Sequence, residues 1–277
     1  MLEVSKPAGL DITMRQEAYV KRSSMDSDTK AAVRDYFNRD VLGYRRAYSA
    51  PDGARAEIFR ERRRLVLELL RRPVGRVLDI GSGPGVFTHA LLERGGDCWV
   101  ADISFAMVAA AREENARSDV TGVHHLVADI ELLPYRARAF DSVLCVGLLQ
   151  YLVAPDTALQ ELARIARPGA QVIITFPNRR SPLNRLHESL VSVLRRGRAS
   201  LSRLGLDFRP SESRLTFRTD VPNTSFTLDE IDAQSRATGL RPDGIAYHSL
   251  HFPFAVPGLG LIGRVWDPLA NRVLDPK

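Results

Sequence analysis

The stretch RVLDIGSGPGVF, residues 76–87, decides the fold of this 277-residue chain. A short apolar run, typical of a buried strand, is followed by three glycines at alternate positions: Gly81, Gly83 and Gly85. Such a turn between a strand and a helix is a common ligand site. A Walker A loop would need Lys-Ser/Thr after its glycines, but Pro-Gly-Val is found here. A dinucleotide fingerprint would need a glycine at the sixth position, where a valine stands.

Beyond this stretch, apolar runs typical of strands alternate with helical patterns. Strands are expected at 76–80, 97–102, 122–128, 140–146 and 170–176, with a sixth near 241–249, and helices at about 86–94, 104–118 and 155–167. The alternation predicts an α/β fold, a Rossmann-like, doubly wound, mostly parallel sheet with helices on both faces.

Two further helices are predicted outside this alternation. Residues 51–72 form one, with an apolar stripe through Ile58, Leu65, Leu69 and Leu70. Thr227 begins the other as N-cap, and Gly239 ends it. We therefore expect four regions: an N-terminal tail and helical lid (1–55), the core (56–178), a basic helical insertion that shapes the acceptor site (179–224), and a segment that completes the core (225–277).

The composition, 44% apolar and 26% charged, is that of a globular protein. No apolar run approaches the roughly 20 residues of a membrane-spanning helix, and the first 30 residues lack the apolar segment of a signal peptide. We therefore expect a cytoplasmic protein. The spacing of histidine and cysteine resembles no zinc site, so no metal is expected.

Three acidic residues stand at the ends of three successive predicted strands. Asp79 precedes the first glycine by two positions, Asp102 ends the second strand, and Asp129 ends the third. A carboxylate beside the glycine turn would repel a pyrophosphate but would suit an ammonium or a sulfonium. A carboxylate at the second strand end can accept from a ribose diol. Together the three acids predict a pocket for a cationic nucleoside, of which S-adenosylmethionine (SAM) is the example.

The motifs around these acids resemble those of class I SAM-dependent methyltransferases. The segments that carry the resemblance are VLDIGSGPG, VADIS, ADIELLPY, FDSVLCVGLLQYL and ALQELARIARPGAQVIITFPN, within residues 76–178. The resemblance implies that Asp79 and the glycines Gly81, Gly83 and Gly85 lie against the methionine moiety of SAM. It implies that Asp102 holds the ribose and Ile103 lies beside the adenine. Asp129 and Ile130 would meet the adenine edge, and Cys145 is assigned to the same pocket.

Residues at the remaining strand ends are candidates for binding the methyl acceptor. They are Gln150, Tyr151, Asn178 and Arg179, to which the aromatic N-terminal segment adds Tyr36 and Tyr48 as parts of a lid. Many members of the family carry a histidine shortly after the fourth strand, where this chain has Gln150. His248 and His251, after the predicted sixth strand, are therefore the candidate general bases.

Residues 179–218 hold ten arginines against three acidic residues. A helix in this segment presents an apolar face and ends in Arg195, Arg196 and Arg198. One interpretation is a lid over a soluble acceptor; the other is peripheral contact with an anionic membrane surface. Nucleic acid is not the expected partner, because only Phe208 and Phe217 interleave with the arginines.

The sequence thus predicts a SAM-dependent methyltransferase of a small molecule. Oxygen is the favoured acceptor atom, in a secondary metabolite, a quinone or a lipid-like compound. Two alternatives remain open at this point. One is an RNA or protein methyltransferase that grips phosphates with the arginine-rich segment. The other is a catalytically silent binding module with the same fold.

Overall fold

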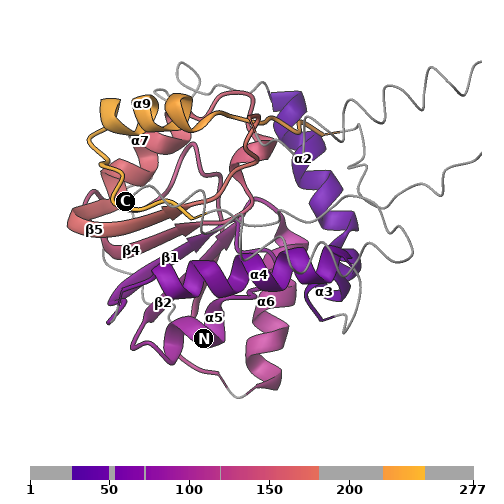
Figure 1. Ribbon diagram of the computed structural model, residues 1–277. Coiled ribbons are helices and arrows are strands. Elements are labelled where there is room, and N and C mark those ends of the chain that lie inside the picture. Colours follow the sequence, from indigo (N-terminus) through magenta and orange to yellow (C-terminus); the bar gives the residue numbers. More distant parts are fainter. Residues whose placement is uncertain (1–26, 50–53, 72, 119, 181–220, 247–277) are drawn as a thin grey trace, which may run out of the picture.

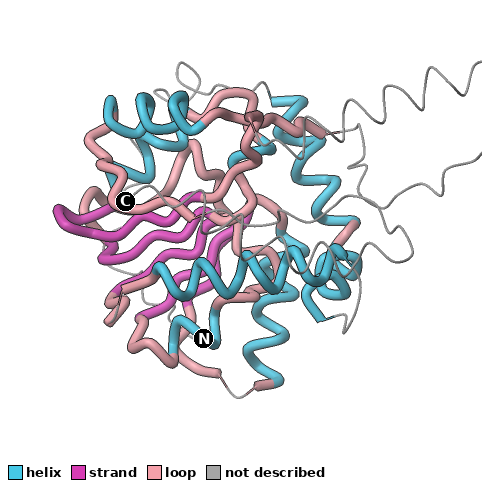
Figure 2. The backbone as a smooth tube through the Cα atoms, viewed as in Figure 1, coloured by secondary structure: helices cyan, strands magenta, loops and turns pink. Residues whose placement is uncertain are grey.

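Five strands form one sheet between two layers of helices (Figures 1 and 2). The computed structural model describes residues 27–49, 54–71, 73–118, 120–180 and 221–246. The helices and strands in chain order are α2 (Ser27–Arg39), α3 (Val41–Ser49), α4 (Ala54–Leu69), β1 (Arg76–Ile80), α5 (Thr88–Leu92), β2 (Asp97–Asp102), α6 (Phe105–Arg117), β3 (His124–Val127), β4 (Phe140–Cys145), α7 (Asp156–Ile165), β5 (Ala166–Ile174) and α9 (Leu228–Ala237), with a 3₁₀ turn at Leu149–Tyr151.

The sheet has the strand order β3-β2-β1-β4-β5, and every neighbouring pair is parallel. The chain moves outward from β1 through β2 to β3 and then returns to the other side of β1 with β4. Helices α4, α5 and α6 cover one face, and α7 and α9 cover the other (Figure 1). The predicted doubly wound α/β fold is confirmed. Its switch point lies between β1 and β4, where the carboxyl ends of the strands open a crevice for ligands.

The strands are buried on both faces, as a covered parallel sheet requires. In β1, for example, Val77, Leu78 and Ile80 have 1% or less of their surface exposed. Val66 of helix α4 and Leu70, directly after the helix, pack against the sheet, whereas Leu69 is 41% exposed. The predicted stripe was therefore wrong at Leu69. Within the described residues, no helix is long and apolar enough to cross a membrane.

The fifth strand begins earlier than predicted. Its first residue, Ala166, pairs with Phe140, but the register then shifts so that Ser142 pairs with Gln171. The intervening residues include Gly169 at φ +80° and form an irregularity in the strand rather than the end of the preceding helix. The predicted sixth strand near 241–249 is wrong over its described part, since residues 241–246 are exposed and form no strand. Residues 181–220, most of the predicted basic insertion, lie outside the described residues.

Helix α9 begins with the predicted cap. Thr227 Oγ1 accepts from the backbone N–H of Glu230 at 3.2 Å, and Glu230 Oε2 accepts from the N–H of Thr227 at 2.8 Å. Two backbone donors of the first turn are thereby satisfied in a capping box. Gly239 follows the helix at φ +91°, the left-handed conformation in which helices commonly end.

Replacing Thr227 with alanine should lower the free energy of unfolding by about 1 kcal/mol, because a first-turn N–H loses its acceptor. Urea unfolding followed by circular dichroism measures the change. Thr227→Ser keeps the hydroxyl and is the matched control, with a midpoint close to that of the unchanged protein. An alanine variant as stable as the serine variant would contradict a contribution from the cap.

Candidate functional site

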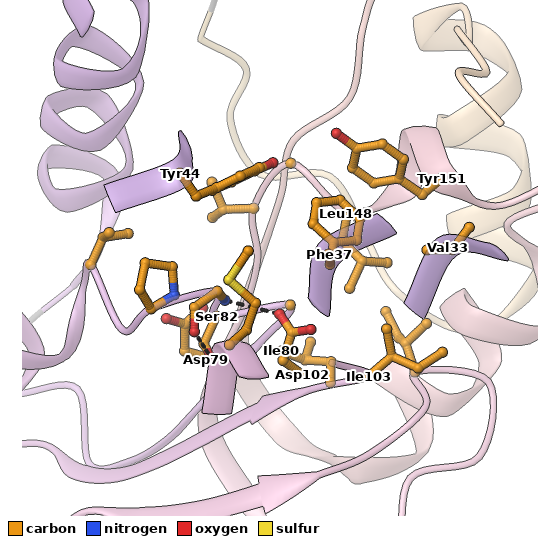
Figure 3. A pocket seen from close by; sticks show the side chains of 18 of the residues that line it. Val33, Phe37, Tyr44, Asp79, Ile80, Ser82, Asp102, Ile103, Leu148 and Tyr151 are labelled. Carbon is orange, nitrogen blue, oxygen red and sulfur yellow. Dashed lines mark hydrogen bonds between the residues drawn. The ribbon is translucent and has the colours of Figure 1, made fainter. Parts of the chain in front are cut away.

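A pocket lies at the carboxyl ends of the strands, on the switch point between β1 and β4 (Figure 3). Its floor comes from the ends of β1 and β2, one wall from the loop after β3, and another from the segment after β4. Side chains of α2, α3 and α4 close it from above. It encloses about 880 Å³ of space, its open mouth included.

The glycine turn forms the floor beside β1. The backbone N–H groups of Gly81 and Ser82 donate to the carbonyl of Ala101 at 2.8 and 3.1 Å, which ties the turn to β2. Gly81 has φ +71°, and a Cβ atom there would lie only 2.4 Å from Leu148 Cδ1. Only glycine fits this position without displacing the segment after β4. The turn therefore leaves bare backbone facing the cavity.

Asp79 has a carboxylate without a partner in this floor. Its side chain is 1% exposed, and the buried Oδ2 atom makes no hydrogen bond. Burial, with a further contribution from the negative charge of Asp102, raises the pKa of Asp79 to about 7. A buried carboxylate is costly unless a cation or donor meets it. A ligand with a positive charge would satisfy Asp79 here.

Asp102, at the end of β2, lies close to Asp79 and is held by the backbone (Figure 3). Its Oδ2 accepts from Gly83 N–H and its Oδ1 from Ser104 N–H, both at 2.9 Å. Burial raises the pKa of Asp102 to about 6, although these hydrogen bonds oppose the shift. Each carboxylate oxygen can accept a second hydrogen bond, so Asp102 can still receive two neighbouring hydroxyls of a ligand.

Asp129 lines the pocket together with Ile130, after β3. Lys30 of α2 lies 2.6 Å from Asp129 Oδ2 and 2.6 Å from Glu131 Oε2, whose side chain is fully buried. One ammonium thus faces two carboxylates at this end of the pocket. A ligand amino group that reaches Asp129 would share it with Lys30. No sequence pattern points to Lys30, because its partner Asp129 lies 99 residues further along the chain.

Aromatic rings form the side of the pocket opposite to the two aspartates (Figure 3). Phe37 packs edge-on against Tyr151 and Tyr44, with ring centroids 4.8 and 5.6 Å apart. Burial is the main reason that the pKa of Tyr44 is raised well above its usual value, and the neighbouring Tyr151 adds to the shift. Tyr44 therefore remains protonated at neutral pH and acts as a hydrogen-bond donor, not as a base.

The N-terminal helices supply part of this aromatic side. Tyr48 of α3 lines the pocket and accepts a hydrogen bond from Arg62 Nη2 at 2.5 Å. Arg62, from α4, lines the pocket as well, although the sequence pattern of that helix did not mark it. Tyr36 does not line the pocket; its ring packs edge-on against Phe37 at 5.1 Å.

The structure places five other predicted residues outside the pocket lining. Gly85 packs against α6, where a Cβ would lie 3.1 Å from Ala111 Cβ. Cys145 is fully buried in the apolar core. Gln150 is buried, and its backbone carbonyl accepts a hydrogen bond from the backbone N–H of Thr224. Asn178 forms a backbone bridge with Phe226, and Arg179 pairs with Glu230 on the surface.

The remaining predicted residues divide into two groups. The structure brings together around one cavity Asp79, Gly81, Gly83, Asp102, Ile103, Asp129, Ile130, Tyr48 and Tyr151. The candidate bases His248 and His251 lie outside the described residues. Among the residues that are described, no group of three or more His, Cys, Asp or Glu side chains is placed to hold a metal ion.

Comparison with known proteins agrees with this geometry. Residues 78–174 match the family model described as a methyltransferase domain. Malonyl-[acyl-carrier protein] O-methyltransferase of Salmonella typhimurium is 36% identical over 111 residues, 40% of this chain and 42% of the relative. Ubiquinone/menaquinone biosynthesis C-methyltransferase of Burkholderia mallei is 32% identical over 121 residues, 42% of this chain and 49% of the relative. The chain therefore spans less than half the length of these curated relatives.

Among solved structures, magnesium protoporphyrin IX methyltransferase from Synechocystis, with bound S-adenosylhomocysteine (SAH), superimposes with a TM-score of 0.60. The match covers 80% of this chain and 94% of that one at 18% identity, and it shows a shared fold. Residues 78–174 are thus similar to a methyltransferase domain, and the chain shares its fold with a solved methyltransferase.

Proposed function

We propose that this chain binds SAM in the pocket above β1 and β2 and methylates a small organic acceptor on oxygen. One observation carries the proposal: the buried Asp79 carboxylate beside the glycine turn has an oxygen without a partner. SAM supplies a methyl group on a positively charged sulfur, next to an ammonium that such a carboxylate can bind. The unpartnered oxygen of Asp79 and the glycine floor both fit this cofactor.

Different residues of the pocket bind different parts of the cofactor, each according to its chemistry. Asp79 accepts from the ammonium, and Asp102 accepts from the ribose hydroxyls. Ile103 and Ile130 provide apolar surface for the adenine, and Asp129 accepts from the adenine amino group beside Lys30. These roles use side chains that line one continuous cavity.

The aromatic side of the pocket is the proposed acceptor site. Phe37, Leu148 and Leu152 offer apolar surface to a planar or aliphatic molecule, and the Tyr44–Tyr151 pair offers hydroxyls to an acceptor oxygen. Transfer of a methyl group depends mainly on aligning the acceptor atom with the methyl carbon. The relative named as an O-methyltransferase of malonyl-[acyl-carrier protein] supports oxygen as the acceptor atom.

The function can be tested by following a labelled methyl group. Purified protein is incubated with SAM labelled in its methyl group and with a cell extract, which is then divided into organic-soluble, RNA and protein fractions. We expect the label in the organic-soluble fraction, with much less label from the Asp102→Ala variant. Label in RNA or protein would contradict a small-molecule acceptor. SAM binding without transfer to any fraction would indicate a binding module instead of an enzyme.

A further inference from the structure

Three tyrosine hydroxyls gather on the aromatic side of the pocket. Figure 3 shows the hydroxyl ends of Tyr44 and Tyr151 pointing toward one another, on the side away from Asp79 and Asp102. Tyr48 belongs to the same group, since it interacts electrostatically with Tyr44 and with Tyr151. All three tyrosines line the cavity. Helix α3 and the 3₁₀ turn after β4 thus bring three phenols to one part of it.

Tyr44 and Tyr48 keep their protons at neutral pH. Burial is the main reason that the pKa of each is raised above its usual value. A phenol that holds its proton donates a hydrogen bond and does not take a proton from a substrate. This side of the pocket therefore donates hydrogen bonds to a ligand oxygen instead of removing a proton from it.

Arg62 of α4 adds a positive charge beside these hydroxyls. Its Nη2 donates to the Tyr48 hydroxyl at 2.5 Å. Against the larger upward effect of burial, its charge lowers the pKa of both Tyr44 and Tyr48. The guanidinium lies against the bare backbone of Gly147, where a Cβ atom would come within 2.7 Å of Arg62 Nη1. Hydroxyl donors next to a cation favour a negatively charged oxygen over a neutral one.

We propose that the methyl acceptor is a carboxylic acid, that its carboxylate binds to the hydroxyls of Tyr44 and Tyr151, and that the product is a methyl ester. The inference rests on the proposed function and names the class of its acceptor. A lone pair of the carboxylate forms the bond to the methyl carbon. The carbon–sulfur bond breaks, and its electron pair stays on the sulfur. The products are SAH and a neutral ester, and no proton is released.

A carboxylate suits the arrangement better than a neutral alcohol or amine does. Carboxylic acids are ionised at neutral pH, whereas an alcohol or an amine must lose a proton when it is methylated, and protonated Tyr44 and Tyr48 do not accept it. A carboxylate also has about four lone-pair sites. It can therefore accept from two tyrosines and still present a lone pair to the methyl carbon.

The chemical class of the acceptor and of the product tests the assignment. An organic extract of cells is divided into acids that dissolve in bicarbonate and the remaining phenols and neutral compounds. Each part is incubated with the protein and with SAM labelled in its methyl group. We expect labelled products from the acids. Mild alkali hydrolyses methyl esters but leaves methyl ethers and methylamines intact, so it should release nearly all of this label as volatile methanol.

The variants Tyr44→Phe and Tyr151→Phe test the two hydroxyls. At low extract concentration each should methylate the acids about ten- to a hundredfold more slowly, the effect of one hydrogen bond to a charged group. The deficit should shrink as the extract is concentrated, and the affinity for SAH, measured by calorimetry, should be unchanged. Tyr135→Phe is the matched control, because it removes a buried hydroxyl that makes no hydrogen bond and lies outside the pocket lining. Its rate should equal that of the unchanged protein.

The outcomes separate this inference from the proposed function. Label in the phenols or neutral compounds, or label that resists alkali, would overturn the carboxylate acceptor while leaving a methyltransferase of small molecules. Unchanged rates in both tyrosine variants would overturn the binding role of the hydroxyls. A deficit that persists at every extract concentration, or a loss of SAH affinity, would show a structural role and would overturn it too. No transfer to any part of the extract would contradict the proposed function itself.

Discussion

The Asp79→Asn variant should bind SAH at least about thirtyfold more weakly than the unchanged protein and should nevertheless be more stable without ligand. The affinity falls because the ammonium loses a buried, charged acceptor, a loss of roughly 2–5 kcal/mol in comparable pairs. The stability rises because asparagine does not have to be ionised inside the core, where Asp79 has no partner for Oδ2. Calorimetry with SAH and urea unfolding of the ligand-free proteins measure the two effects.

The gain in stability should depend on pH in a defined window. Burial raises the pKa of Asp79 from 3.8 to about 7 in the folded protein, so the folded state retains a proton that the unfolded state has released. The free energy of unfolding of the unchanged protein should therefore fall as the pH rises from about 4 to about 7, and the contribution of Asp79 should be constant above that. The advantage of Asp79→Asn should be greatest above pH 7, at up to about 4 kcal/mol, and should vanish near pH 4.

Binding of SAH should follow the opposite trend. Below pH 7 the ligand must displace the proton of Asp79, so the affinity of the unchanged protein should rise with pH until about 7, and that of Asp79→Asn should rise less steeply. Asp35→Asn, a substitution on the exposed surface of α2, is the control for both measurements. A variant that matches the unchanged protein in SAH affinity would show that Asp79 does not bind the ammonium.

The Asp102→Ala variant should bind SAM and SAH about ten- to a hundredfold more weakly, from the loss of roughly 1.5–3 kcal/mol of charged hydrogen bonding to the ribose. Its stability should fall too, because the N–H groups of Gly83 and Ser104 lose their acceptor. Asp102→Asn keeps an amide oxygen for one of these donors and should be intermediate in stability.

A ligand that lacks one ribose hydroxyl distinguishes the loss of ribose binding from a loss of structure in the loops that Asp102 holds. The unchanged protein should prefer SAH to its 2′-deoxy analogue, and Asp102→Ala should bind the two equally weakly. An alanine variant that still prefers SAH would remove Asp102 from the ribose site. Binding of NAD in preference to SAH would contradict the nucleoside assignment altogether.

The acidic residues of this site could be predicted from sequence because each stands where a local pattern ends. A buried strand followed by a glycine turn places its last side chains at the carboxyl edge of the sheet, and this holds for Asp79 and Asp102 whatever the rest of the chain does. Asp129 follows the same logic after β3. The predicted strands differ from the observed ones mainly at their ends, where patterns carry least information.

Lys30 and Arg62 could not be predicted in this way. Each reaches the pocket from a helix that precedes the sheet, and the path of that helix across the strand ends is a matter of tertiary packing. Cys145 was misplaced for a different reason. Because both faces of β4 are buried, the sequence does not reveal which side chains face the cavity and which face the core. The fifth strand is predicted to begin too late because Pro168 and Gly169, residue types that usually mark the end of an element, here lie in an irregular strand.

The contact between Arg62 and Gly147 ties the evolution of two distant positions together. The guanidinium occupies the space that a Cβ atom at position 147 would need, and Gly147 has φ +69°, a conformation in which any side chain is strained. A larger residue at position 147 would therefore strain the backbone and displace the end of the Arg62 side chain. Among proteins of this fold, we expect arginine at the position of Arg62 to occur mostly together with glycine after the fourth strand.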